Sequence, residues 1–388
     1  MYDVILVRYG EIGLKGQNRS FFVNKLISNI KKAIQKIANF NIKKTPGRIF
    51  IYPEQNYEQI LEKLKMIPGI VSVSPTITAE LDYDELEKSS LELFKKEVTD
   101  FPTTFKVKTN RPNKSFPKNS MEVNRDIGAY ILDNYSEDQL SVDIHNPEHS
   151  LNFDIRNDQV YIFTRTISGP GGLPVGSSGK GLLLLSGGID SPVAGWQAMT
   201  RGMELEAIYF HSPPYTSERA KEKVMELARI LSQYGTNIKL HLSHFTEIQR
   251  AIKQKCDKQF TITIMRRMMY RIATKIAQQN QNQVLLTGES IGQVSSQTLE
   301  NISTISSVTN MPILRPLITI DKQEIIKMAK KIGTYKTSIQ PYEDCCTIFV
   351  PNHPVTKPTL AEAKANEADL EIEKLVKSGV ENTQFEIS

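Results

Sequence analysis

The chain has 388 residues, with 48 Lys and Arg against 43 Asp and Glu, which gives a formal charge of +5. This length allows two or three domains, each with its own core, and the three cysteines are too few for a disulfide framework. A secretory segment and an apolar run long enough to cross a bilayer are both missing, so we expect a cytoplasmic protein with no membrane association.

Basic residues are unevenly distributed along the chain. Residues 1–50 contain ten Lys or Arg against two acids, and residues 101–125 contain six against one. Residues 361–388 reverse the balance, with seven acids and three lysines. Two local basic surfaces favour a polyanionic partner larger than a nucleotide. The alternative is that these lysines only solvate exposed helix faces.

The first 80 residues predict a ferredoxin-like unit. Half of residues 3–8 are β-branched, and residues 18–38 carry apolar side chains at helical spacing. Residues 47–52 and 70–77 read as strands around a helix over 57–66. We assign β-α-β-β-α-β order to this part of the chain.

A second α+β segment follows. Its basic stretch, from Phe105 to Ser120, interleaves lysines and an arginine with aromatic and proline residues before a helix. This stretch resembles the THUMP domain, an RNA-binding module of tRNA-modifying enzymes, and would grip phosphates and read shape. The expected elements are helices over 83–98 and 121–135 and strands over 105–108 and near 140–144, 151–155 and 160–166.

A glycine- and proline-rich linker over 169–179 leads into alternating strands and helices. That alternation predicts a doubly wound parallel sheet with ligands at the carboxyl ends of its strands. The expected strands begin at Gly181 and continue at 205–210, 238–242 and 284–287, and the expected helices cover 217–234 and, as one long helix, 248–279.

The first strand of this region precedes Ser186-Gly187-Gly188-Ile189-Asp190-Ser191. Two adjacent glycines let backbone N–H groups converge on an anion, and the next helix, expected to begin with Ser191 as cap, directs its dipole there. A Walker A assignment for Gly176 to Gly181 fails, because Gly181 stands where Ser or Thr is needed. The motif resembles the PP-loop of ATP pyrophosphatases, which cleave ATP between its α and β phosphates.

Together these features resemble the tRNA 4-thiouridine synthetase family, ThiI. The resemblance rests on Arg8-Tyr-x-Glu11-Ile-x-Leu-Lys15-Gly16, Gly172-Leu-Pro-Val-Gly176, the PP-loop and Glu343-Asp344-Cys345. It implies an α/β and α+β multidomain protein with a ferredoxin-like domain over 1–58, a THUMP domain over 59–167, a linker over 168–180 and a PP-loop domain over 181–388. We expect no rhodanese domain of the kind that longer members carry, so sulfur would come from a cysteine desulfurase or another persulfide donor.

The resemblance also implies an ATP site. For Leu184, Leu185, Tyr209 and Phe210, the alternative to nucleotide binding is packing in the core. For Arg266, the alternative is an exposed position on a helix, and the neighbouring Arg267 could take its place in the site. Gly288 ends a strand where a ligand needs close backbone approach. The expected nucleotide-binding residues are Leu184, Leu185, Ser186, Gly187, Gly188, Asp190, Ser191, Tyr209, Phe210, Arg266, Gly288 and Gln297.

Three residues are expected to be catalytic, and two of them, Lys322 and Cys345, match positions that the resemblance links to catalysis. Asp190 would act through Mg²⁺ or by ordering the backbone N–H groups of the PP-loop. The alternative is that it only caps a helix. Lys322 would neutralise phosphate charge, although Asp321 and Glu324 also suit a helix start around it. Cys345 would carry sulfur as a thiolate or persulfide, with Cys346 or Cys256 as possible resolving thiols. ATP would adenylate O4 of uridine 8 in tRNA, and sulfur from Cys345 would displace AMP. Magnesium is implied by the triphosphate of ATP and not by any cluster of metal ligands in the sequence.

Five basic residues are expected to contact tRNA: Lys15, Lys108, Arg111, Lys114 and Lys118. The resemblance further implies a homodimer. Three other functions stay open: another PP-loop tRNA-modifying enzyme, a non-catalytic tRNA-binding protein, and sulfur transfer for thiamine thiazole synthesis. The THUMP-like segment and the Cys345 motif argue against another PP-loop enzyme, and the intact PP-loop with Cys345 argues against a non-catalytic binding protein.

Overall fold

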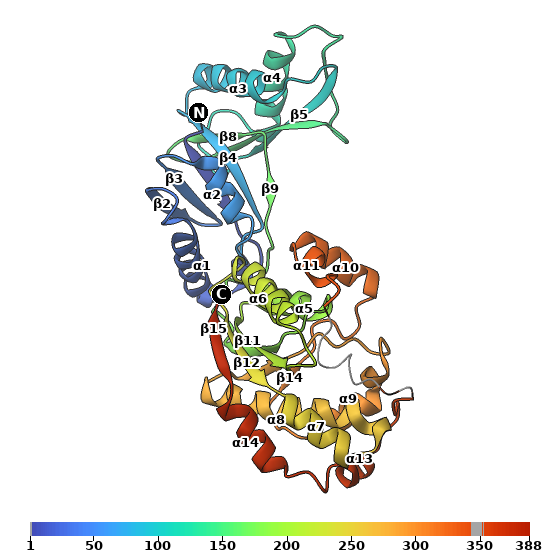
Figure 1. Ribbon diagram of the computed structural model, residues 1–388. Coiled ribbons are helices and arrows are strands. Elements are labelled where there is room, and N and C mark those ends of the chain that lie inside the picture. Colours follow the sequence, from blue (N-terminus) through green and yellow to red (C-terminus); the bar gives the residue numbers. More distant parts are fainter. Residues whose placement is uncertain (1, 343–350, 352) are drawn as a thin grey trace. The chain divides into compact units, whose positions relative to one another are not determined.

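The computed structural model describes residues 2–342, 351 and 353–388. The chain divides into two compact units, Met1–Gly172 and Leu173–Ser388 (Figure 1). The division falls within the glycine-rich stretch around residue 170, where Gly171 and Gly172 both have positive φ. Within the described part of the chain, every helix is too short or too polar to span a bilayer.

The first unit begins with the predicted ferredoxin-like arrangement. The residues of β1, β3 and β4 were predicted, whereas the assigned order requires one more strand, to which no residues had been given and which β2 supplies. The sheet order β2-β3-β1-β4 is antiparallel throughout, and α1 packs on it through side chains spaced three or four residues apart. The elements are β1 (Val4–Arg8), α1 (Arg19–Ile34), β2 (Phe40–Thr45), β3 (Arg48–Pro53), α2 (Tyr57–Leu64) and β4 (Ser72–Ala79).

The rest of this unit continues the same sheet. Strand β4 pairs with β1 on one side and with β8 and β9 on the other, so nine strands form one sheet. A domain boundary at residue 58 would fall within α2 and stays a prediction. The further elements are α3 (Tyr83–Glu97), β5 (Thr103–Asn110), α4 (Ser120–Leu132), β6 (Leu140–Val142), β7 (His149–Ile155), β8 (Val160–Phe163) and β9 (Ile167–Ser168).

The second unit is the predicted doubly wound sheet, in the order β14-β13-β10-β11-β12-β15. All its pairings are parallel except that of β15 with β12, an antiparallel edge that the sequence did not indicate. The strands are β10 (Lys180–Leu184), β11 (Glu204–His211), β12 (Lys239–His244), β13 (Val284–Leu286), β14 (Ile313–Leu314) and β15 (Gln384–Ile387).

Helices cover both faces of this sheet (Figure 1). Helices α5 (Asp190–Thr200) and α6 (Glu218–Ser232) pack on one face. The other face carries a large apolar core built with α7 (Thr246–Lys255), α8 (Thr261–Gln279) and α14 (Ile372–Glu381). The remaining described helices are α9 (Leu299–Ser306), α10 (Lys322–Lys331), α11 (Tyr335–Ser338) and α13 (Leu360–Asn366).

Two predictions about helices in this unit are wrong. The single long helix over 248–279 is interrupted, because Cys256 is extended and the Asp257 side chain accepts a hydrogen bond from the Gln259 N–H at 2.9 Å. An aspartate that bonds its own backbone in this way competes with the helical ladder. The helix after the PP-loop begins at Asp190 with Ile189 as its N-cap, so Ser191 lies inside the helix and caps nothing.

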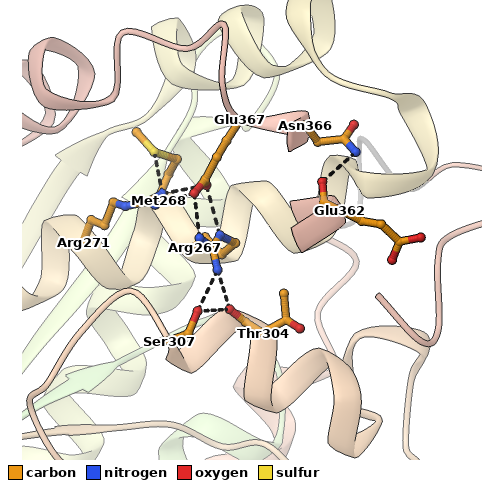
Figure 2. A network of polar contacts seen from close by, with 8 residues as sticks. All are labelled: Arg267, Met268, Arg271, Thr304, Ser307, Glu362, Asn366 and Glu367. Atoms are coloured by element: carbon orange, nitrogen blue, oxygen red, sulfur yellow. Dashed lines mark hydrogen bonds and ion pairs between the residues drawn. The ribbon is translucent and has the colours of Figure 1, made fainter. Parts of the chain in front are cut away.

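A buried ion-pair network ties the C-terminal segment to α8. Glu367 accepts hydrogen bonds from Arg267 and Arg271, with Arg267 Nη2 at 2.6 Å from Oε1 (Figure 2). Arg267 also donates to the Thr304 carbonyl and the Ser307 hydroxyl of α9 and its C-cap. Because Arg267 is only 2% exposed, this network fixes α9 and α13 against α8.

Candidate nucleotide site

The loop between β10 and α5 is closed by its own serines. The Ser191 hydroxyl accepts a hydrogen bond from the Ser186 N–H at 2.9 Å and lies 3.1 Å from the Ser186 hydroxyl. The Gly188 N–H donates to Ser186 Oγ at 3.3 Å. These bonds hold Ser186 to Ser191 in a compact turn in front of the positive end of α5, a geometry suited to an anion.

Asp190, the first residue of α5, lies between two side chains from distant segments. Its Oδ1 pairs with Lys322 Nζ, and its Oδ2 accepts a hydrogen bond from Gln293 Nε2 at 2.8 Å. Lys322 is the first residue of α10, which Asp321 caps by accepting from the Gln323 N–H at 2.8 Å. Lys322 is therefore both a first-turn residue and the cation beside the PP-loop.

A cavity of about 270 Å³ opens beside this loop at the carboxyl ends of the parallel strands. Leu184, the last residue of β10, and Leu185 lie along one wall, and Tyr209 and Phe210, near the end of β11, form another. Tyr209 and Phe210 are 2% and 5% exposed, so they serve as core residues and as cavity lining at once.

Arg266 lies in the cavity wall through contacts with a buried carboxylate. Its Nη2 is 2.9 Å from Glu289 Oε1, and its Nη1 donates to the Ser296 hydroxyl at 3.2 Å. Arg315 Nε lies 2.6 Å from Glu289 Oε2, which also accepts from the Tyr270 hydroxyl at 3.1 Å. Burial by itself would raise the pKa of Glu289, but the two guanidinium groups hold it below its ordinary value.

Gly288 and Gln297 complete the predicted lining. A Cβ at Gly288 would lie 2.6 Å from the Ser191 nitrogen and 2.8 Å from the Asp190 carbonyl carbon, so only glycine fits against the PP-loop backbone. Gln297 is 8% exposed, and its Oε1 has no hydrogen-bond partner among the described residues. A buried amide oxygen at a cavity wall is suited to accept a hydrogen bond from a ligand.

Most of the predicted nucleotide residues are thus brought together around one cavity. Those that line it are Leu184, Leu185, Ser186, Asp190, Ser191, Tyr209, Phe210, Arg266, Gly288 and Gln297, with Gly187 and Gly188 in the adjoining loop. Lys322 reaches it through Asp190. Cys345 and Cys346 lie outside the described residues, so the catalytic role of Cys345 stays a prediction.

The five predicted RNA contacts all lie in the first unit, where their environments differ. Lys108 and Lys114 are exposed. Arg111 donates to the carbonyls of Lys114 and Phe116 at 3.2 and 3.0 Å, so it shapes the loop. Lys118 pairs with Asp126 at 2.9 Å and lies over the Tyr83 ring. Lys15 pairs with Glu11 at 3.2 Å. Because the other three residues have these partners within the unit, we expect Lys108 and Lys114 to be the main contacts with RNA.

Several residues at the site were not predicted from the sequence, above all Glu289, which lines the cavity, and Gln293, which contacts Asp190. A carboxylate three residues after the end of β13 was a usable signal, since ligands meet parallel sheets at that end. Gln293 carried no such signal, because its contact with Asp190 spans 103 positions. In the described ranges, no group of three His, Cys, Asp or Glu side chains is placed to hold a metal ion.

Comparisons with known proteins identify the family. The family described as "Thiamine biosynthesis protein (ThiI)" matches residues 176–372, the ThiI ferredoxin-like domain matches residues 4–74, and the THUMP domain matches residues 80–165. A "Probable tRNA sulfurtransferase" of Halothermothrix orenii is 58% identical over 99% of this chain and 98% of its own length. The chain belongs to the ThiI family.

Other ThiI relatives match equally completely. A "Probable tRNA sulfurtransferase" of Thermoanaerobacter sp. is 52% identical over 97% of both chains. A solved structure described as a 4-thiouridine synthetase–RNA complex with bound ATP is 40% identical, covers 100% of both chains and superposes with a TM-score of 0.90. The predicted fold class, with ferredoxin-like, THUMP and PP-loop parts, is confirmed for this ThiI chain.

Proposed function

We propose that this protein is an ATP-dependent tRNA sulfurtransferase that converts uridine 8 of tRNA into 4-thiouridine. The observation that carries the proposal is the cavity at the carboxyl ends of β10, β11 and β13, which adjoins a closed PP-loop. The chain is similar over its whole length to a 4-thiouridine synthetase whose structure contains ATP and RNA. ATP suits the cavity, and RNA suits the basic residues of the first unit.

ATP would lie with its triphosphate at Ser186 to Ser191 and its adenine between the ends of β10 and β11. Uridine O4 would attack the α-phosphate, and pyrophosphate would leave. Lys322 is positioned by Asp190 to neutralise the charge that develops on the phosphates. Magnesium would be held mainly by the triphosphate, since Mg²⁺ commonly takes only one or two protein carboxylates there, and Asp190 is the carboxylate at hand.

In the second half-reaction, the terminal sulfur of a Cys345 persulfide would attack C4. The C4–O bond would break and AMP would leave. A thiol would then cleave the S–S bond, leaving sulfur on C4 and a disulfide on the protein or carrier. Cys256 is a poor candidate for this thiol, because burial, with smaller effects of Glu367 and Asp369, raises its pKa to about 11. We therefore favour Cys346 or an external thiol.

The remaining parts of the proposal concern partners and location. Exposed basic residues of the first unit would contact tRNA phosphates, and two copies of the chain would form a homodimer. A cysteine desulfurase or another persulfide donor would load Cys345. A cytoplasmic location accords with a tRNA substrate and with the reducing conditions that a persulfide carrier and its thiol need.

The test is 4-thiouridine formation, followed by its near-ultraviolet absorbance, on unmodified tRNA with ATP, Mg²⁺ and a persulfide source. We expect product with the parent protein and none with Cys345→Ala or Asp190→Ala. AMP release without thiolated uridine would keep the nucleotide site but contradict the substrate. No ATP consumption by the parent would contradict the enzyme assignment altogether.

A further inference from the structure

The second unit contains two buried carboxylates that each pair with two arginines. Glu289 pairs with Arg266 and Arg315, and it is 1% exposed. Glu367 pairs with Arg267 and Arg271 and is 4% exposed. The two clusters share their chemistry but differ in place: Glu289 lines the cavity beside the PP-loop, whereas Glu367 lies in α13's C-cap, away from that lining.

Glu289 is held firmly relative to the PP-loop. It follows Gly288, whose Cα is so close to the backbone of Asp190 and Ser191 that an added Cβ would lie within 2.8 Å of both. The Thr287 hydroxyl donates to Glu289 Oε2 at 3.0 Å, and the Tyr270 hydroxyl donates to the same oxygen at 3.1 Å. The carboxylate is therefore fixed by the segment that follows β13 and by α8.

Arg266 receives its orientation from this fixed carboxylate. The ion pair to Glu289 and the hydrogen bond to Ser296 constrain two edges of a planar guanidinium group, which fixes its plane against the cavity. Arg315 brings a second positive charge to the same carboxylate. Two cations and one anion leave a net positive cluster beside a cavity proposed to hold an anionic nucleotide.

We propose that Glu289 is a positioning residue for ATP binding, which acts by holding Arg266 in the wall of the cavity. The inference deepens the proposed function and rests on it, since it takes ATP as the ligand. Glu289 touches no reacting atom in this scheme. Its contribution is to hold the Arg266 side chain in its binding orientation before the nucleotide arrives. Without Glu289, this side chain would have to become ordered when the nucleotide binds.

The test is a double-mutant cycle on the dissociation constant for ATP, measured by calorimetry on the full chain. The proteins are the parent, Glu289→Gln, Arg266→Ala and the double variant. We expect Glu289→Gln to weaken ATP binding by about tenfold, since the ion pair that orients Arg266 loses its negative charge. The double variant should bind ATP as Arg266→Ala does, because Glu289 acts through Arg266.

A structural role alone would give another pattern, and Glu367→Gln is the matched control. It removes a carboxylate from an equivalent two-arginine cluster, so its thermal midpoint should fall while its ATP dissociation constant stays at the parent value. Glu289→Asp is a second route if Glu289→Gln folds poorly. It keeps the charge, but its shorter side chain cannot reach both arginines, so we expect it to weaken ATP binding. This effect of Glu289→Asp should again be absent when Arg266 is alanine.

Two outcomes would overturn the inference alone. One is an unchanged ATP dissociation constant in folded Glu289→Gln or Glu289→Asp, and the other is an effect of either variant that persists in full when Arg266 is alanine. A parent protein that does not bind ATP would instead overturn the proposed function together with this inference.

Discussion

Arg266 and Arg267 are adjacent on α8, yet their guanidinium groups pair with different carboxylates. Arg266 lies 2.9 Å from Glu289 in the cavity wall, and Arg267 lies 2.6 Å from Glu367 in the interior. Neighbouring helix positions point about 100° apart, so one helix serves the candidate nucleotide site and the core at once. The sequence left open which arginine belongs to the site, and this geometry favours Arg266.

The Asp190–Lys322 pair should be essential to turnover. We expect Asp190→Asn to lower the rate of 4-thiouridine formation by on the order of 10²-fold, because it removes the charge that positions Lys322. The control is Glu324→Gln, which removes the carboxylate of an exposed Lys–Glu pair on α10, the helix of Lys322. This change should have little effect on the rate of 4-thiouridine formation. Parental activity in Asp190→Asn would contradict the assigned role.

Gly288→Ala should damage the nucleotide site through the backbone. The new Cβ would press on the Ser191 nitrogen and the Asp190 carbonyl carbon, which belong to the backbone and cannot rotate away. We expect a loss of about 1–3 kcal/mol in the free energy of unfolding, together with weaker ATP binding. Gly13→Ala is the control, because its Cβ would meet nothing within 4 Å. Denaturant titration and calorimetry would measure both effects.

Glu206 should make the stability of the second unit depend on acid pH. Burial by itself raises the pKa of this carboxyl, but hydrogen bonds from His241, Lys180 and Asn282 outweigh it and lower the pKa to about 2.

Because the folded-state pKa lies below the ordinary value, this stabilisation is complete above about pH 4.5 and is lost as the pH falls toward 2. The loss amounts to about 3 kcal/mol at most. Glu206→Gln should flatten that part of the unfolding profile, whereas Glu204→Gln, an exposed change on the same strand, should keep it. An unchanged profile in Glu206→Gln would contradict the prediction.

Lys108 and Lys114 should contribute to tRNA affinity through phosphates. We expect the double Ala variant to bind unmodified tRNA more weakly and to show a smaller salt dependence, by about one unit of slope for each lost phosphate contact. Lys374→Ala with Lys377→Ala removes two exposed lysines from α14 and is the control. Filter binding between 50 and 200 mM salt, about the range in which such contacts weaken, would detect the difference. An unchanged slope in the Lys108 and Lys114 variant would exclude these residues as phosphate contacts.

The fold was accessible from the sequence wherever apolar spacing was regular. The missed strand β2 shows the limit: its burial pattern has no fully buried residue, and Asn41, Lys43 and Lys44 give it the composition of a loop. It forms because β3 offers it a pairing edge, a tertiary cause that a local pattern does not carry. The break before α8 was missed for the opposite reason, since the apolar period continues past the Asp257 cap.

Local sequence pattern alone predicted the candidate site only where its residues are neighbours in the chain, and the distant residues that were predicted came from the family resemblance. Ser186 to Ser191 form one local motif, whereas Lys322 was expected at the site only from family resemblance, and its contact with Asp190, across 132 positions, was not predicted. The pairing of Glu289 with Arg266 joins two segments that meet only in the folded sheet. Such contacts depend on strand order, which the sequence gives less directly than the elements themselves.

Strand β4 belongs to both halves of the first unit, since it pairs with β1 through residues 72–76 and with β8 through residues 77–79. Neither half can release this strand without exposing unpaired backbone groups in the other. We therefore expect the amide hydrogens of β1, β4 and β8 to exchange with solvent in one cooperative opening. The ferredoxin-like part and the RNA-binding part would then unfold as a single element, and neither would be separable by limited proteolysis.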